Sequence, residues 1–159
     1  MSIFQKKSAT AKRDRRGRGL VEASLVLPVV LLLIMGIFEY SRYVMTLHIF
    51  DNAAREGARY AISHVSPVVL GGTTYGGTTT DVTNVVTSFL AGQTLSNQQT
   101  QVYLSDSLGN NIGTWTNAQA GQSICVKITG NYNVTVATLL GLPSTLSITA
   151  TAVMDCEVQ

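Results

Sequence analysis

The chain has 159 residues, of which 45% are hydrophobic and only 13% are charged. This length suits about one domain, and the composition excludes a disordered chain, which needs more charge and fewer apolar residues. The net charge of +2 hides two regions of opposite sign: residues 1–18 carry seven Lys or Arg against one carboxylate, and residues 19–159 carry four against eight. This distribution excludes a basic nucleic-acid-binding surface on the folded part, so no nucleic-acid partner is expected.

A long apolar segment follows the basic tail. Residues 19–38 read GLVEASLVLPVVLLLIMGIF, with Glu22 as the single ionisable side chain. As a helix they would span roughly 30 Å, the thickness of the hydrocarbon core of a bilayer. The alternatives are a buried helix of a soluble protein and a cleaved secretory signal. The run is apolar on all faces, little chain follows it to bury it, and no small-x-small cleavage site follows it, so a transmembrane helix is predicted.

The cations determine the expected orientation. The flank after the apolar segment has only Arg42, Arg55 and Arg59, spread over a longer stretch than the basic tail. By the positive-inside rule, the N-terminus is predicted to stay in the cytoplasm and the C-terminal part to be exported across the inner membrane, in a single-pass topology. The expected organisation is a basic cytoplasmic leader (1–17), a transmembrane helix (18–39), an exported continuation of the helix (40–64) and an exported α+β domain (65–159).

The membrane edge carries a sequence that resembles a processing site. Gly17 lies just before the apolar helix, and Glu22 lies five residues later, inside the start of that helix. This spacing resembles that of type IV prepilins, in which a prepilin peptidase cuts after the glycine on the cytoplasmic side. The resemblance implies cleavage between Gly17 and Arg18, so that Glu22 becomes the fifth residue of the mature chain. Gly19 lies too close to Glu22 to fit as well.

Glu22 also has a physical interpretation. A carboxylate in the first turn of a helix is favoured by the free N–H groups there, but at the lipid boundary it is costly unless a cation meets it. In the pilin family that cation is the new α-amino group of an adjacent subunit, which implies an assembly role for Glu22. Two alternatives stay open. Arg18, four residues earlier on the same helix face, can pair with Glu22, or the carboxylate can reach the headgroups without an assembly role.

Further residues resemble a named family. The segments VEASLVLPVVLLLIMGIFEYSRY (21–43) and DNAAREGARYA (51–61) resemble the TadE-like family, pseudopilins of the Tad (Flp) tight-adherence pilus. LSITATAVM (146–154) is similar to the closing strand of that family. The resemblance implies a pilin-like fold, with a prepilin peptidase, other pilins or pseudopilins and the Tad assembly platform as partners. Major Flp pilins are little longer than the helix, so the large C-terminal domain favours a minor pseudopilin.

The helix is expected to continue beyond the membrane. Pro67 ends a run without helix breakers, so one helix is predicted from about residue 20 to 64. Pro28 removes one backbone hydrogen bond inside it, and a kink or local melting is predicted there. The second half of the helix carries a small-residue stripe, formed by Ala53, Ala54, Gly57, Ala58 and Ala61. This stripe is expected to pack against the protein's own C-terminal domain, with a neighbouring subunit as the alternative.

The rest of the chain predicts an α+β domain. Residues 65–79 are rich in Gly and Thr and predict a loop, which lacks the Gly-Lys-Ser/Thr of a phosphate-binding loop. Helical spacing of apolar residues predicts an amphipathic helix over 80–91 that covers a sheet. Strands are predicted at 101–105, 124–129, 132–136 and 145–155. The expected fold is α+β, with a long N-terminal transmembrane and stem helix and a short amphipathic helix packed on an antiparallel sheet.

Cys125 and Cys156 both lie in the part predicted to be exported. An even number of cysteines in an oxidising compartment predicts one disulfide. Alternation along the strands is an objection, because it places Cys125 on the face of Lys127 and Cys156 on the face of Met154. A bulge or a frayed end at Glu157 would bring the two thiols together.

The sequence contains no catalytic constellation, which would need a nucleophile with a base, a metal cluster or a carboxylate pair in a cleft. His48 and His64 would lie about 24 Å apart along one helix, too far to share a metal. Glu39 and the other carboxylates of this helix are expected on its solvated side, beside arginines. We therefore expect no catalytic residue, no metal, no cofactor and no small-molecule substrate.

The sequence favours a minor pseudopilin that takes part in assembly or priming of a Tad pilus. One alternative is an uncleaved bitopic envelope protein whose exported domain is a binding or structural module. Another is an exported enzyme or adhesin on a membrane stalk. Removal of residues 1–17 would change the net charge from +2 to −3, because five Lys or Arg and eight carboxylates would remain.

Overall fold

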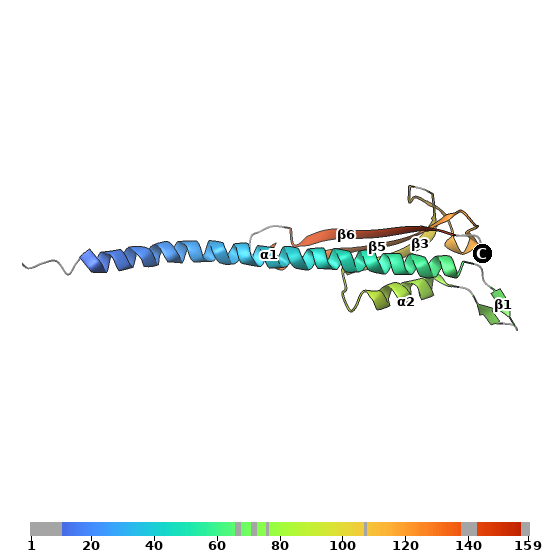
Figure 1. The fold of residues 1–159 in the computed structure, drawn as a ribbon, viewed down its shortest axis with the longest axis horizontal. Helices are drawn as coiled ribbons and strands as arrows, with labels where there is room; N and C mark the ends of the chain where they lie inside the picture. Colours follow the sequence, from blue (N-terminus) through green and yellow to red (C-terminus); the bar gives the residue numbers. More distant parts are fainter. Residues whose placement is uncertain are drawn as a thin grey trace, which may run out of the picture. The chain divides into compact units, whose positions relative to one another are not determined.

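The computed structural model describes residues 11–65, 68–70, 73–75, 77–106, 108–137 and 143–156. The chain divides between Tyr40 and Ser41 into two compact units. A long helix, α1, occupies the first unit and continues into the second, which also contains a short helix and an antiparallel sheet (Figure 1). The predicted α+β arrangement is confirmed.

Helix α1 (Ala11–Ser63) has 53 residues. It begins at Ala11 rather than at about residue 20, because the Ala, Lys and Arg residues before the apolar segment have high helix propensity. It also continues through Pro28. The predicted local melting at this position is therefore wrong, since a proline removes one backbone hydrogen bond and the neighbouring turns of the helix keep theirs.

Helix α2 (Thr79–Phe89) begins at a capping box. The hydroxyl of Thr78 accepts a hydrogen bond from the Asp81 backbone N–H at 3.2 Å, and the Asp81 carboxylate accepts one from the Thr78 backbone N–H at 2.9 Å. These bonds to Thr78 hold the pKa of Asp81 below its ordinary value. The helix predicted over 80–91 thus begins at Thr79, where the side chains of Thr78 and Asp81 accept hydrogen bonds from backbone N–H groups that have no partner within the helix.

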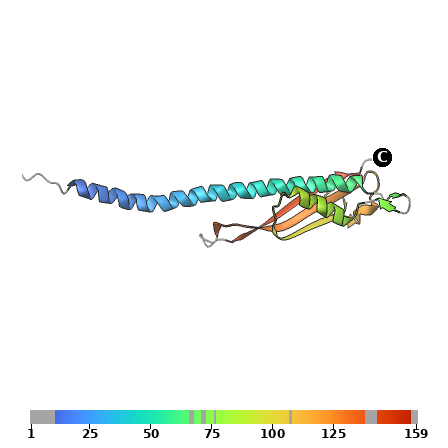
Figure 2. The same cartoon turned by 90° about the horizontal axis from the view of Figure 1, so that it is seen from below.

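The sheet has four antiparallel strands in the order β4-β3-β5-β6. Their bounds are β3 Ser96–Ser105, β4 Asn111–Gly113, β5 Ser123–Asn133 and β6 Thr145–Asp155. Figure 2 shows the long strands side by side. β5 was predicted as two strands, at 124–129 and 132–136. It is continuous because Gly130, which lies between the two predicted strands, pairs with Ile148 and leaves room for Leu95 to pack on its backbone.

Four short elements, each of three residues, were not predicted. The predicted loop at 65–79 contains a hairpin of β1 (Val68–Leu70) and β2 (Thr73–Tyr75). The segment between β3 and β5 contains β4 and a 3-10 helix, η1 (Trp115–Asn117). Trp115 is buried, and its indole N–H donates to the Thr79 hydroxyl at 3.0 Å. A three-residue element has too few positions for periodicity to reveal it.

One hydrophobic core joins the second half of α1 to α2 and the sheet. Alternate residues of β5 and β6 face this core, because side chains alternate across a strand. Phe50 and Trp115 are the largest fully buried side chains in the described residues. The core also contains Val82, Val86, Ile124, Val126, Ile128, Ile148, Ala150 and Ala152.

The small-residue stripe lies inside this core. Its four alanines are each 0% exposed, and Gly57 is also buried. A Cβ atom added to Gly57 would lie 2.6 Å from Cγ2 of Val86 and 3.4 Å from Cγ1 of Val126. The stripe thus lets α1 approach both α2 and β5 closely. It has no surface left to offer a neighbouring subunit.

We predict that Gly57→Ala destabilises the domain by about 1–3 kcal/mol, because the added methyl group forces Val86 out of its position. Thermal unfolding of the full chain in detergent, followed by circular dichroism, measures the effect. Gly36→Ala is the matched control, since a Cβ there meets nothing within 4 Å. Equal melting temperatures for the Gly57→Ala chain and the wild type would contradict the close packing.

Candidate functional site

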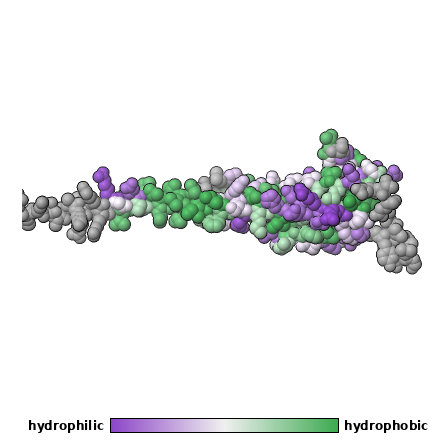
Figure 3. Space-filling model, viewed as in Figure 1, coloured by the Kyte–Doolittle hydropathy of each residue, from purple (hydrophilic) through white to green (hydrophobic). Residues whose placement is uncertain are grey.

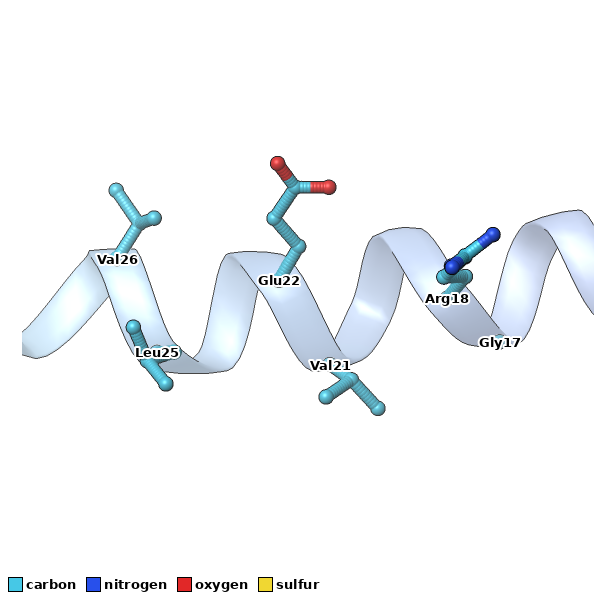
Figure 4. A pocket seen from close by; sticks show the side chains of 6 residues that line it. All are labelled: Gly17, Arg18, Val21, Glu22, Leu25 and Val26. Carbon is cyan, nitrogen blue, oxygen red and sulfur yellow. The ribbon is translucent and has the colours of Figure 1, made fainter.

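The candidate site lies on the N-terminal part of α1. Gly17, Arg18 and Glu22 are all exposed on this helix. Figure 4 shows the side chains of Arg18 and Glu22 extending from one side of the helix, with Val21 and Leu25 on the other. This arrangement follows from the spacing of four residues between Arg18 and Glu22.

Glu22 makes no ion pair with Arg18. Among the hydrogen bonds and ion pairs of the described residues, none joins the two side chains, and the guanidinium of Arg18 points away from the carboxylate (Figure 4). A shallow pocket beside Glu22 is also lined by Val21, Leu25 and Val26, whose apolar side chains offer no hydrogen-bond donor. Neutralisation of Glu22 by Arg18 within one chain, an alternative left open by the sequence, is therefore not adopted in this structure.

The helix that carries Glu22 exposes a large apolar surface. The large apolar side chains between Leu20 and Phe38, apart from Leu32, are between 42% and 73% exposed. The most apolar window of 18 residues has a mean hydropathy of 2.6, and none of it is buried. Figure 3 shows this surface as a green band along the helix. Such a surface is unfavourable in water at about 25 cal/mol per Å², so the segment is a candidate single-pass membrane anchor.

The predicted cleavage bond lies within a helix. α1 begins six residues before Gly17, so the bond between Gly17 and Arg18 is part of a regular helical segment. Only the leader residues 11–17 lie within the described part of the chain, and residues 1–10 fall outside it.

Cys125 and Cys156 are free thiols, which corrects the predicted disulfide. Cys125 lies opposite Val153 of β6, whereas Cys156 follows β6 and belongs to the core on the other face of the sheet. Strand alternation thus places the two cysteines on opposite faces of the sheet, as the objection stated. Two cysteines on opposite faces of a sheet cannot meet the geometry of a disulfide without movement of the backbone.

The face of the sheet with Cys125 has its own buried polar group, which the sequence did not reveal. Tyr103 of β3 lies opposite Cys125, and its hydroxyl donates to the Gly109 carbonyl at 3.2 Å. Burial and a hydrogen bond with Cys125 raise the pKa of Tyr103 to about 12, so the phenol stays neutral at physiological pH. The loop between β3 and β4 brings Gly109 to this tyrosine, a contact without a sequence signal.

Two ionisable side chains outside the candidate site, Glu39 and His64, have distinct surroundings. Glu39 is only 9% exposed, which contradicts its predicted place on the solvated side of the helix. His64 stacks on Tyr60, with 4.0 Å between the ring centroids. Among the described residues, no group of three His, Cys, Asp or Glu side chains could hold a metal ion.

The geometry therefore defines a class of protein, in which one long helix with an apolar candidate membrane span leads into an α+β domain. Comparison with known families is specific to the helix: residues 17–59 match the family model for TadE-like protein. This match confirms, over residues 17–59, the resemblance predicted from the sequence. No curated protein and no solved structure matches the chain.

The family match begins at Gly17 and ends within α1. It thus includes Arg18, Glu22 and most of the small-residue stripe, but none of the strands. The matched range thus contains the apolar surface and most of the contact of the helix with the core.

We predict that both thiols remain unreactive toward a maleimide in the native protein and that both react after unfolding in denaturant without reductant. Burial raises the pKa of the Cys156 thiol, and Cys125 is 0% exposed, so neither native thiol offers an accessible thiolate. Intact-mass spectrometry counts the added groups. Unfolded protein that gains no label without reductant would show that the cysteines form a disulfide.

Proposed function

We propose that this protein is a minor pseudopilin that takes part in assembly or priming of a Tad pilus. The observation that carries the proposal is the Glu22 carboxylate, which is exposed on an apolar helix and makes no ion pair with Arg18. In an apolar surrounding, such a charge is stable only when a cation meets it, so a second protein that supplies the cation would gain affinity. The match of residues 17–59 to the TadE-like family supports this role.

The proposed mechanism links processing to assembly. A prepilin peptidase cuts after Gly17, which creates an α-amino group on Arg18. The amino group of one subunit then pairs with Glu22 of the next, while the apolar surfaces of the two helices pack in the inner membrane. The pairing determines the axial offset between subunits. The C-terminal domain is exported, and the partners are other pilins or pseudopilins and the Tad assembly platform.

The protein acts in this proposal as a structural component without catalytic residues, metal, cofactor or small-molecule substrate. The buried side chains of the second unit support such a role, because they are mostly apolar and belong to one packed core. Their function is to hold the domain in one shape for contact with other subunits.

A second candidate function is an uncleaved bitopic envelope protein whose exported domain is a binding or structural module. The helix favours this candidate, because α1 runs without interruption through the predicted cleavage bond. A helical peptide bond has its N–H and C=O groups engaged along the helix, so a peptidase cannot bind it until the helix opens.

The two candidates differ in the mass of the native protein. We predict that protein purified from membranes of a strain with an intact Tad system has the mass of residues 18–159. In a strain without the prepilin peptidase, the mass is that of the full chain. Intact-mass spectrometry separates these products, and a full-length product in the first strain would support the uncleaved anchor instead.

We predict that Glu22→Ala abolishes pilus assembly without preventing removal of residues 1–17, because the variant keeps the cleavage bond and loses the partner of the new α-amino group. Electron microscopy of surface pili and intact-mass spectrometry provide the two readings. Leu25→Ala is the control, since it shortens an exposed side chain on the other side of the helix without a change in charge. Normal pili with Glu22→Ala would remove Glu22 from the mechanism.

A further inference from the structure

Gly19 is a glycine in a place where the structure requires none. It lies within α1, two residues after the proposed cleavage bond. A Cβ atom added to Gly19 would meet nothing within 4 Å, so no close approach of another group demands a glycine here. Its φ lies outside the left-handed range, so the backbone makes no such demand either.

Gly17 and Gly36 of the same helix are equally open, but several glycines elsewhere in the described residues do have such reasons. Gly57 and Gly130 lie against side chains, with closest distances of 2.6 Å to an added Cβ. Gly121 has a φ of +82°, which favours glycine. Gly19 has neither reason, and in a helix interior it costs about 1 kcal/mol relative to alanine. The cost falls on the turns of the helix that contain the bond between Gly17 and Arg18.

This local cost matters because of how a peptidase acts. Hydrolysis adds one water across the bond, which leaves a carboxylate on Gly17 and an ammonium group on Arg18. The peptidase can bind the bond only when these helical turns are open. Where opening and closing are fast, the rate of cleavage follows the population of the open form, and that population rises with every loss of helix stability.

We propose that Gly19 is a positioning residue for leader removal, which acts by keeping the helix around the Gly17–Arg18 bond easy to open. This inference rests on the proposed function, because it assumes that the bond is cut. It also answers the objection that the bond lies within a helix. The helix does not have to be absent at the cleavage site, only weaker there than along the apolar segment that follows.

The cost of Gly19 largely disappears in the product. After cleavage, Arg18 is the first residue of the chain, and Gly19 lies in the first turn of the shortened helix. The backbone N–H groups of a first turn have no partner within the helix. A glycine there therefore weakens fewer hydrogen bonds than a glycine in the interior, and the apolar helix that enters an assembly keeps its stability.

The test compares substitutions that separate helix propensity from side-chain size. Alanine is smaller than asparagine but is a much better helix former. We expect the Gly19→Ala chain to lose its leader about fivefold more slowly than the wild type, the factor that corresponds to about 1 kcal/mol of helix propensity. The Gly19→Asn chain should be cut faster than the Gly19→Ala chain, although its side chain is larger.

The measurement is a pulse-chase of the full chain in cells with an intact Tad system, with precursor and product separated by mass. Gly36→Ala is the matched control. Gly36 also lies in α1 with nothing within 4 Å of an added Cβ, but it is remote from the cleavage bond, so this variant should be cut at the wild-type rate.

The outcomes separate the two levels of the proposal. A wild-type chain that keeps its leader contradicts the proposed function itself. A wild-type chain that is cut, together with a Gly19→Ala chain cut equally fast, leaves the proposed function standing and overturns the role of Gly19. Slower cleavage of the Gly19→Asn chain than of the Gly19→Ala chain would mean that side-chain size at the binding site of the peptidase controls the rate. That result would also overturn the role of Gly19. Equal slowing by Gly36→Ala would do the same.

Discussion

A single helix, α1, has to suit two surroundings with opposite requirements. Its first half exposes large apolar side chains, which need a non-aqueous environment. Its second half contributes a stripe of small side chains to a packed core, where a methyl group added to Gly57 would displace Val86. The same 3.6-residue period serves both halves, and only the size and distribution of the side chains differ. The close approach of α2 and β5 to the helix depends on this change, because Val86 and Val126 lie where a side chain at position 57 would be.

Glu22 places one charge on the apolar surface of the first half of α1. An unpaired carboxylate on an otherwise apolar surface is unfavourable for an isolated helix in an apolar environment. In a pair of helices, the same carboxylate can bind a cation of the second helix. Apolar packing between helices has little preference for one axial offset over another, whereas a charge that needs a partner has a strong preference. The position of one carboxylate can thus determine an alignment that the surrounding Leu and Val residues leave undetermined.

The sequence predicted those parts of the fold that depend on long or periodic patterns. The apolar run predicted the exposed half of α1, the regular spacing of Val82 and Val86 predicted α2, and β6 begins and ends where alternation placed it. Gly130 shows the limit of such patterns. A glycine between two strand-like segments favours two separate strands, but here its missing side chain leaves the space that Leu95 occupies. That requirement comes from a residue 35 positions earlier, and no local pattern contains it.

The sequence likewise predicted some features of the candidate site and missed others. Spacing alone placed Arg18 and Glu22 on one side of the helix, and the structure agrees. Spacing did not reveal whether the two side chains pair, since that depends on the rotamer of each. The cysteines are the converse case, because their number predicted a bond that the alternation of the strands forbids. Geometry set by the backbone was thus a better guide than an argument from composition.

The place of β6 in the sheet has a consequence for the core of the second unit. β6 is the last strand, and all eleven of its residues pair with β5, which is otherwise paired only with β3. Until Thr145–Asp155 are available, β5 has an open edge and one wall of the core is missing. The packing of the second unit therefore depends on β6, because its pairing with β5 completes the sheet and its alternate side chains complete that wall of the core.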